Sequence, residues 1–419
     1  MKEGLTENKR GLRFALPVAL VWASLLAVDW GARVLVNQEP RRFHRFGRPA
    51  QPYAPMTTYR YAGGYGEADF SGDLTRMLRV PSLVRQYRER RGEIVFETDE
   101  FGFQNTPPVA GRKYEIVVTG DSFVNRGDRS ESTIAGVLER ASARAVYNQG
   151  WPAAGAFTGL RAFLHDPRFR DSPPRWVVWG FIERDMSAAH FARVDAELDA
   201  RHGPAGWWES PRWALLVPAN LQEYLRRYSY VQKYAMVLRS WIDWRFRGRV
   251  SDLVAIAPQG CLGRPFLFYG PELERFERPP GDADRDAIVA ACRAVQARLR
   301  ERGSELLVLL VPDKCNVYRE CLRGLLDPAA IARPDADAFL TRLAGELAAA
   351  GVPAVNLLLP FRERALAGEQ LYWSDDTHWN DAGIAVAGEL VAARLGELEG
   401  RASEGRKSAR LPVALALEN

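Results

Sequence analysis

The feature that most constrains the fold of this chain is a series of short apolar runs that alternate with helical stretches. Helix-like sequence lies between several of these runs, for example at 132–144, 156–164 and 282–302. Strands that alternate with helices form a mostly parallel sheet with helices on both faces. We therefore expect an α/β domain, a three-layer sandwich, with strands at Tyr114–Thr119, Ala145–Asn148, Trp176–Phe181, Leu306–Val311 and Ala354–Leu357.

The amino terminus carries a hydrophobic segment that follows a basic stretch. Apolar or small residues run from 14 to 28, and hydrophobicity resumes after Asp29 as far as 36. The first run is short for a membrane span, which needs about 20 residues, but 14–36 as a whole is long enough. No convincing cleavage site follows. We expect a cytoplasmic segment at 1–13 and an uncleaved signal anchor, or transmembrane helix, at 14–36; a buried core helix is the alternative. Basic residues on its two sides nearly balance and leave the orientation open.

The remainder of the chain divides by composition. Residues 37–108 form a lead-in rich in Pro, Gly, Arg and Tyr, with one strand-like run at 93–97. The strand and helix alternation assigns 109–398 to one domain. Within it, 188–280 breaks the alternation and is rich in Trp, which indicates an insertion. The polar segment 399–419 is expected to be a flexible tail.

Charge and cysteine content exclude several classes of protein. The net charge is +5, but 57 basic residues are nearly balanced by 52 acidic ones, so we expect no nucleic-acid partner. The cysteines form no CxxC pair and have no His nearby, so neither a metal site nor a cofactor is expected. Cys315 and Cys321 are close enough in sequence to bridge across a turn. The sequence nevertheless leaves open how Cys261, Cys292, Cys315 and Cys321 pair, and whether they are free thiols instead.

A serine follows the first predicted strand directly. The strand runs into Gly120-Asp-Ser-Phe123, so Ser122 lies at a strand end on a tight turn. Ligands of open α/β sheets bind at the carboxyl ends of the strands. A Gly-Asp-Ser tripeptide is weak evidence alone, but this position makes Ser122 a candidate nucleophile.

A serine nucleophile needs a general base, most often His. The chain has five histidines, of which only His378 has acids two and three residues upstream, at Asp376 and Asp375. A short loop of this kind can present an imidazole together with its orienting carboxylate. Asn380 and Asp381 are better explained as caps of the following helix.

These blocks, in this order, resemble the SGNH (GDSL-type) hydrolase-like superfamily. Gly120–Phe123 resembles its nucleophile block, 148–155 its glycine block and Asp376-Thr-His-Trp379 its base block. Within the superfamily, 311–318 and the base block are similar to the alginate O-acetyltransferases of the AlgJ/AlgX group. The resemblance implies an SGNH/flavodoxin-like sandwich and a Ser-His-Asp triad.

The resemblance also assigns roles to individual residues. Ser122 would be the nucleophile, His378 the base and Asp376 its orienting acid, with Asp375 as the alternative acid. The oxyanion hole would use the Ser122 N–H and an N–H of the glycine block, in which Ala153 stands at the usual glycine position beside Gly150. Arg184 replaces the usual Asn donor, and it and Arg126 could contact the oxyanion or an anionic sugar or form structural ion pairs. Lys314 and Tyr318 could shape a loop.

The expected function is O-acyl transfer, with acetyl as the expected group, to an extracytoplasmic polysaccharide through an acyl-serine. The alternatives are an esterase of the same fold and a non-catalytic polysaccharide-binding component of a secretion complex. The resemblance implies that a membrane-bound O-acyltransferase supplies the acyl donor. It also implies a bacterial inner-membrane protein, single-pass, with its catalytic domain in the periplasm, where disulfides are permitted.

Overall fold

The structure is a computed structural model of the 419-residue chain. By internal contacts the chain divides into two units: Met1–Ala50 with Gly203–Val250, and Gln51–His202 with Ser251–Asn419, which we call the sheet unit. The residues that the structure describes are six positions between 20 and 28, then 52–61, 72–152, 155–199, 230–247, 251, 253–257, 259–333 and 338–410.

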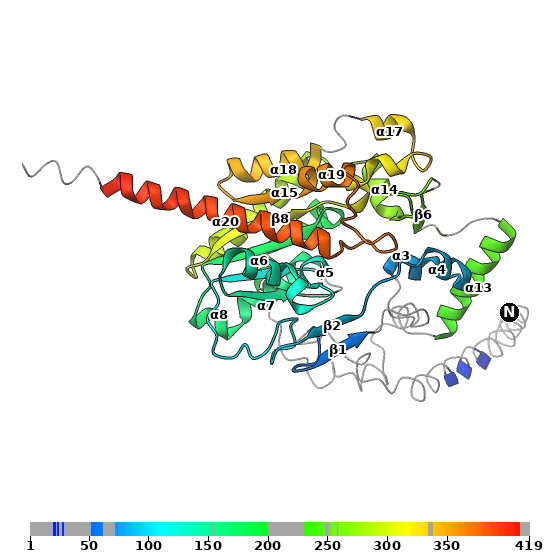
Figure 1. The fold of residues 1–419 in the computed structure, drawn as a ribbon, viewed down its shortest axis with the longest axis horizontal. Helices are drawn as coiled ribbons and strands as arrows, with labels where there is room; N and C mark the ends of the chain where they lie inside the picture. The colour runs from blue at the N-terminus through cyan, green and yellow to red at the C-terminus, as the bar shows by residue number, and fades with distance from the viewer. Residues whose placement is uncertain are drawn as a thin grey trace, which may run out of the picture. The chain divides into compact units, whose positions relative to one another are not determined.

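A five-stranded parallel sheet forms the centre of the sheet unit (Figure 1). Its strand order is β4-β3-β5-β8-β9, and all neighbouring strands are parallel. The five predicted strands and the α/β fold are thereby confirmed. The bounds are Ile116–Gly120 (β3), Val146–Gly150 (β4), Trp176–Ile182 (β5), Glu305–Val311 (β8) and Ala354–Asn356 (β9).

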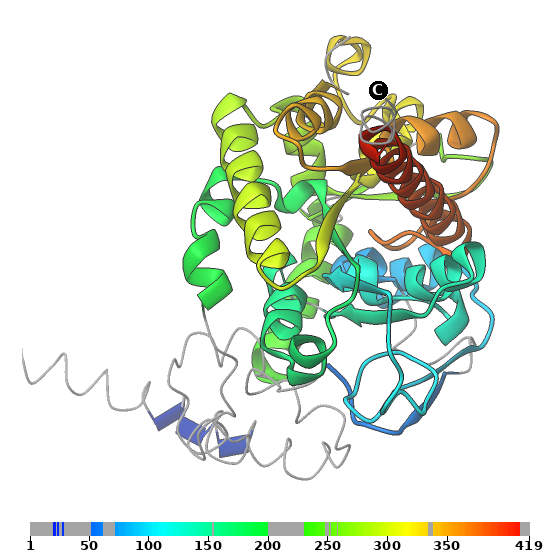
Figure 2. The same cartoon turned by 90° about the vertical axis from the view of Figure 1, so that its left-hand side faces the viewer.

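Helices cover both faces of this sheet (Figure 2). Side chains alternate along each strand, so that Val178 of β5 lies in one core and Val177 in the other. The first core is closed by α6 (Ile134–Ser142) and α20 (Asp381–Arg410). The second is closed by helices that pack on the opposite face, which are α7 (Ala156–His165), α15 (Asp282–Arg300) and α18 (Ala338–Ala349).

Shorter elements connect the layers. Those that lead to the site are α5 (Ser122–Asn125) after β3 and α16 (Lys314–Val317) after β8. The others are η1 (Ser130–Ser132), α8 (Pro167–Asp171), η2 (Glu183–Asp185), α9 (Ala188–Phe191), α10 (Val194–Asp199), α14 (Gly270–Glu277), η4 (Arg319–Leu322), α17 (Pro328–Ala332) and α19 (Leu358–Leu366).

The predicted lead-in contributes regular structure to the sheet unit. β1 (Thr58–Tyr61) pairs antiparallel with β2 (Ile94–Glu97), which is the strand-like run that the sequence predicts. Between them lie α3 (Asp73–Leu78) and α4 (Pro81–Tyr87). From Gln51 onward the lead-in therefore belongs to the same compact unit as the sheet.

The segment predicted as an insertion is shared between the two units. Gly203–Val250, with α13 (Tyr230–Arg247), groups with the amino-terminal residues. The hairpin of β6 (Val254–Ile256) and β7 (Leu267–Tyr269) groups with the sheet. No described helix is both long and apolar enough to cross a membrane, and most of the predicted anchor at 14–36 lies outside the described residues.

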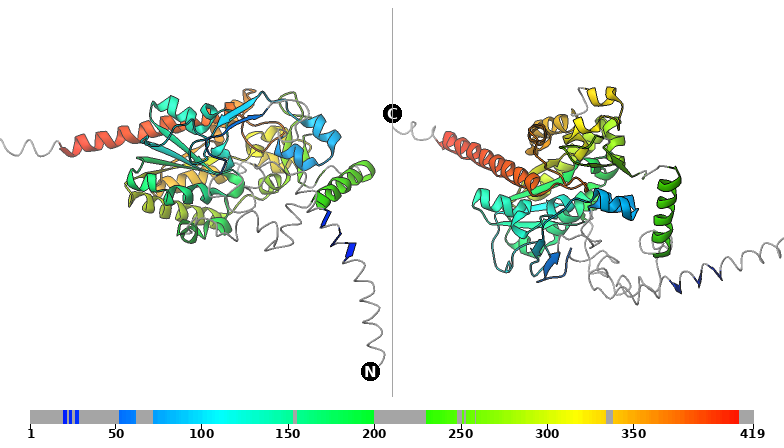
Figure 3. Two further views of the ribbon diagram at one scale, coloured as in Figure 1. Left: turned by 90° about the horizontal axis from the view of Figure 1, so that it is seen from below. Right: turned by 45° about the vertical axis from the view of Figure 1, so that its right-hand side comes forward.

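The carboxyl-terminal helix α20 differs from its predicted length. It continues to Arg410, into the segment expected to be a flexible tail from 399 (Figure 3). Glu399 explains part of this extension, because it forms an ion pair with Arg144 and accepts a hydrogen bond from Trp176 Nε1 at 2.9 Å. The structure thus continues the helix past 399, where a tail is expected.

Candidate active site

Ser122 lies where β3 ends and α5 begins. The next strand, β4, lies on one side of β3 and the following one, β5, on the other, so the direction in which strands are added reverses at β3. Gly120 permits the close approach of β5, because a Cβ at this position would lie 2.2 Å from the Gly180 carbonyl oxygen. Asp121 caps α5 by accepting a hydrogen bond from Phe123 N at 2.8 Å. Burial, with the charge of Asp185 second, raises the pKa of Asp121 to about 7. The turn thus fixes Ser122 at the carboxyl edge of the sheet, where such folds bind ligands.

A loop of residues 370–380, which we call the base loop, brings His378 to this serine. Ser122 Oγ and His378 Nε2 are 2.8 Å apart, within hydrogen-bond distance. His378 Nδ1 lies 2.7 Å from Asp376 Oδ1, which also accepts a hydrogen bond from the His378 backbone N–H. The Phe123 ring stacks on the imidazole with centroids 4.6 Å apart and fixes its plane. The structure therefore brings Ser122, His378 and Asp376 together in one relay.

Asp375, the alternative acid, contacts a different set of groups. Its Oδ2 accepts a hydrogen bond from Gly72 N at 2.8 Å, and its Oδ1 accepts one from Arg91 Nη2 at 2.8 Å. A Cβ at position 72 would lie 2.0 Å from the Asp375 carbonyl oxygen, so only glycine fits there. Asp375 anchors the base loop to the lead-in, and the geometry favours Asp376 as the partner of His378.

Two arginines hold Asp376 in its ionised form. Arg91 Nη2 lies 3.2 Å and Arg126 Nη1 3.3 Å from Asp376 Oδ2. Burial alone would raise the pKa of Asp376, but Arg126, His378 and Arg91 outweigh burial and hold that pKa well below its usual range. An ionised Asp376 is what an imidazole needs to become imidazolium when it takes a proton.

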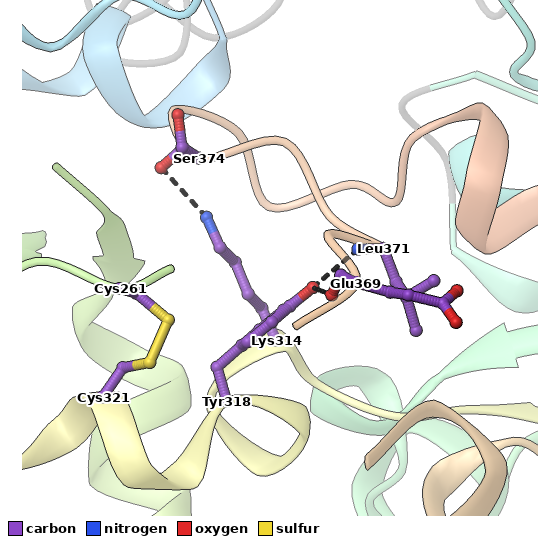
Figure 4. The surroundings of a disulfide bond; sticks show 7 residues. All are labelled: Cys261, Lys314, Tyr318, Cys321, Glu369, Leu371 and Ser374. Carbon is purple, nitrogen blue, oxygen red and sulfur yellow. Dashed lines mark hydrogen bonds between the residues drawn. A yellow bond between two sulfur atoms is a disulfide. The ribbon is translucent and has the colours of Figure 1, made fainter. Parts of the chain in front are cut away.

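The base loop is held from below by α16 and the residues after it (Figure 4). The ammonium of buried Lys314 donates to the carbonyl oxygens of Trp373, Ser374 and Asp376 at 2.7, 3.1 and 3.0 Å. Tyr318 Oη accepts a hydrogen bond from Leu371 N at 2.6 Å. Lys314 and Tyr318 therefore shape this loop, which is one of the roles that the sequence leaves open for them.

A disulfide lies next to these contacts. Cys261 and Cys321 are bonded, with Cα atoms 5.3 Å apart, whereas Cys292 and Cys315 are free and buried. The bridge across a turn from Cys315 to Cys321, one of the pairings left open, is therefore not formed. The disulfide joins the β6–β7 hairpin to η4. The hairpin itself donates from Leu267 N to Ser374 O at 2.8 Å.

The other predicted oxyanion contacts that the structure describes, Gly150 and Arg184, have partners within the protein. The Gly150 N–H donates to Asn148 Oδ1 at 3.0 Å. Arg184 Nη1 forms an ion pair with buried Glu272 Oε1 at 2.6 Å, which is the structural alternative given for this residue. Ala153 lies outside the described residues. Arg126 is the predicted contact that does reach the relay, through Asp376 and at 3.3 Å from His378 Nδ1.

Two functional candidates escaped sequence reasoning. Arg91 and Asp73 both come from the lead-in and both contact the base loop; Asp73 accepts hydrogen bonds from Thr377 N and Oγ1 at 2.8 and 2.6 Å. Neither lies in a periodic or motif-like segment, and their partners are some 300 positions away in the chain. Only pairing across the fold reveals them.

Among the described residues, Asp73, Asp376 and His378 place potential metal-ligand atoms within 4.8 Å of one another. However, the Asp376 and His378 atoms are 2.7 Å apart. Two ligands of one zinc ion, each about 2 Å from the metal in tetrahedral geometry, lie roughly 3.3 Å apart. The spacing is that of a hydrogen bond between the two side chains.

The chain is similar to several known proteins. The chain is 29% identical over 140 residues to the probable alginate O-acetylase AlgJ of Pseudomonas fluorescens, which covers 33% of the chain and 34% of that protein. The probable alginate O-acetylase AlgJ of P. putida is 31% identical over 136 residues, which cover 31% of the chain and 34% of that protein. That of P. aeruginosa is 32% identical over 139 residues, which cover 32% of the chain and 33% of that protein. Each match spans about a third of the relative's length. The family described as SGNH hydrolase-like domain, acetyltransferase AlgX, matches residues 51–183 and 262–416, more than half of the chain, and the protein therefore belongs to that family.

Proposed function

We propose that this protein transfers O-acyl groups, in the first instance acetyl, to a polysaccharide through an acyl-enzyme on Ser122. The observation that carries the proposal is the relay from Ser122 Oγ through both nitrogens of His378 to Asp376, at 2.8 and 2.7 Å. A serine, an imidazole and a buried, ionised carboxylate in this order are the groups that acyl transfer requires. Membership of an acetyltransferase family supports the choice of reaction.

In the first half-reaction Ser122 Oγ attacks the carbonyl carbon of the donor ester while His378 Nε2 takes the hydroxyl proton. The negative charge that develops on the carbonyl oxygen is stabilised by the Ser122 N–H, which, at the first position of α5, has no carbonyl partner inside the helix. The C–O bond of the donor then breaks, and His378 returns the proton to the leaving oxygen.

In the second half-reaction a sugar hydroxyl replaces the leaving group. His378 Nε2 takes the proton of that hydroxyl, its oxygen attacks the acyl carbon, and the bond to Ser122 Oγ breaks with return of the proton to Oγ. Asp376 remains ionised and stabilises the imidazolium in both halves. Water in place of the sugar would give hydrolysis, so the outcome depends on which hydroxyl reaches the acyl-serine.

The acceptor, the donor and the location follow from weaker support and are part of the same proposal. The relatives' name, alginate O-acetylase, favours a polysaccharide acceptor, and a membrane-bound O-acyltransferase is proposed as the source of acyl groups. The Cys261–Cys321 bridge favours an oxidising compartment such as the periplasm. The hydrophobic sequence at 14–36 is proposed to anchor the chain there.

The purified chain, supplied with 4-nitrophenyl acetate with and without an alginate oligosaccharide, tests the proposal. We expect nitrophenol release and acetylated oligosaccharide by mass spectrometry, with both lost in Ser122→Ala. Free acetate alone, even at high acceptor concentration, would establish the esterase. Unchanged nitrophenol release in Ser122→Ala, or none in the folded wild type, would refute the acyl-enzyme and leave a polysaccharide-binding role.

A further inference from the structure

Asp73 places a second carboxylate near the imidazole of His378, although the two residues are far apart in the sequence. Its Oδ2 lies 3.6 Å from His378 Nδ1, on the same nitrogen that Asp376 contacts at 2.7 Å. The two acids are 303 positions apart in the sequence. Asp73 begins α3, in the lead-in segment that precedes the nucleophile strand.

The position of Asp73 is fixed by contacts that leave it little freedom. Both of its oxygens accept hydrogen bonds from Thr377, the residue between the acid and the base of the relay. The preceding Gly72 donates to Asp375, and Thr75 N donates to the Asp375 carbonyl oxygen at 3.3 Å. Thr75 Oγ1 also donates to Asp375 Oδ2 at 3.5 Å, so five hydrogen bonds join the first turn of α3 to the base loop.

The charges around the imidazole show what a second acid accomplishes. The charged groups that face the imidazole or the base loop from the described elements are Asp73, Asp375, Asp376, Glu89, Asp128, Arg91, Arg126 and Lys314. Arg126, 3.3 Å from His378 Nδ1, opposes protonation of the ring. Asp73, at 3.6 Å from the same nitrogen, opposes this effect of Arg126 and adds to that of Asp376.

We propose that Asp73 is a positioning residue that stabilises the protonated state of His378, so that the lead-in is part of the catalytic unit. The inference rests on the proposed function, in which His378 takes a proton from Ser122. Asp73 touches no substrate atom. It acts through its charge on the imidazolium, and it holds Thr377, and with it the backbone of the base loop, in register with Ser122. Burial, with the charge of Asp376 second, raises the pKa of Asp73, in keeping with two acids that share one partner.

Asp73→Asn tests the charge with little change of shape, because an amide can hydrogen-bond to both Thr377 groups. An opposite charge within about 4–6 Å changes proton affinity by roughly one pH unit or more. For aryl-acetate turnover by the full chain we expect Asp73→Asn to lower kcat/KM about tenfold and to shift the acid limb of its pH profile by about one unit to lower pH, because the ring then loses its proton more readily.

Two further variants separate charge from structure. Thr377→Val removes the hydroxyl contact but keeps the carboxylate, and we expect its acid limb to coincide with that of the wild type. Asp73→Glu keeps the charge, and we expect its acid limb to coincide with that of the wild type. Should Asp73→Asn fail to fold by circular dichroism, Asp73→Ser, which also removes the charge and can still hydrogen-bond to Thr377, takes its place. An unshifted limb in folded Asp73→Asn, or an equal shift in Thr377→Val, would overturn the inference. Ser122→Ala distinguishes the two levels: if it retains turnover, the proposed function fails, whereas an inactive Ser122→Ala with an unshifted Asp73→Asn refutes this inference alone.

Discussion

Replacing Arg91 by Met is expected to destabilise the protein far more than the loss of a surface charge would. The Arg91 side chain is 3% exposed, and it pairs with Asp375 and Asp376, whose side chains are both 0% exposed. Its guanidinium also lies 4.4 Å from the centre of the Trp373 ring. Burial lowers the pKa of Arg91, but the two carboxylates outweigh it and raise that pKa, so the cation is bound more tightly when folded.

The magnitude follows from what the substitution leaves behind. Methionine fills a similar volume, but two carboxylates remain in a buried site with one fewer positive charge. Removal of one partner from a buried ion pair costs about 3–5 kcal/mol. For a domain of this size each kcal/mol lowers Tm by roughly 2–4 °C. We therefore expect a decrease in Tm of about 10 °C and a lower urea midpoint, followed by circular dichroism at pH 7.

Arg60→Met is the matched control. Arg60 lies in the same lead-in, is 68% exposed and faces Glu93 at 3.8 Å. An exposed pair of this kind contributes about 0–1 kcal/mol, so Tm should change by at most about 4 °C. If Arg91→Met shifted Tm no more than Arg60→Met does, the buried arginine would not be a structural charge, and the account of how the base loop is anchored would be wrong.

Three further outcomes follow from the site. Asp376→Asn should lower kcat for ester turnover by about 10³–10⁴, whereas Asp375→Asn should chiefly lower Tm; equal losses of kcat would contradict the assignment of the acid. Lys314→Met leaves buried carbonyl oxygens without their donor and should reduce kcat/KM at least tenfold, against no change in exposed Lys113→Met, as measured with the same ester. Burial raises the pKa of Asp121 to about 7, so ionisation of this carboxylate opposes folding increasingly between about pH 4 and pH 7. Asp121→Asn can still cap α5, and its Tm should therefore rise relative to that of the wild type across that window. A Tm difference that stays constant with pH would refute the shift.

The sheet and the relay were predictable from sequence because each is encoded locally. An apolar run such as Leu306–Val311 is buried on both faces, and such runs have few alternatives to a central parallel strand. Ser122 and His378 stand in short motifs whose residue types the chemistry requires. That the two motifs meet was implied by the family resemblance, because no local pattern relates positions 256 apart in the chain.

The anchoring contacts were not predictable in the same way. Arg91 and Asp375 are ordinary polar residues in aperiodic segments, and their pairing exists only once the lead-in packs on the base loop. The bond between Cys261 and Cys321 likewise depends on how the β6–β7 hairpin docks, since the two cysteines are 60 positions apart. The extension of α20 was not predictable either, because Glu399 pairs with Arg144, which lies far away in the sequence between α6 and β4. Long-range polar partners leave no periodic signal in one sequence.

The order of the site's parts along the chain has a bearing on synthesis. A ribosome makes the amino-terminal residues first, so Asp73 and Ser122 emerge long before Lys314 and His378. Ser122 and His378 are 256 positions apart, and the base loop takes its shape from α3, α16 and the β6–β7 hairpin together. A chain still in synthesis, or one cut before residue 370, holds a serine with no base beside it. Under the proposed function the unfinished chain is inert by construction, and acyl transfer begins only when nearly the whole sheet unit has been made and folded.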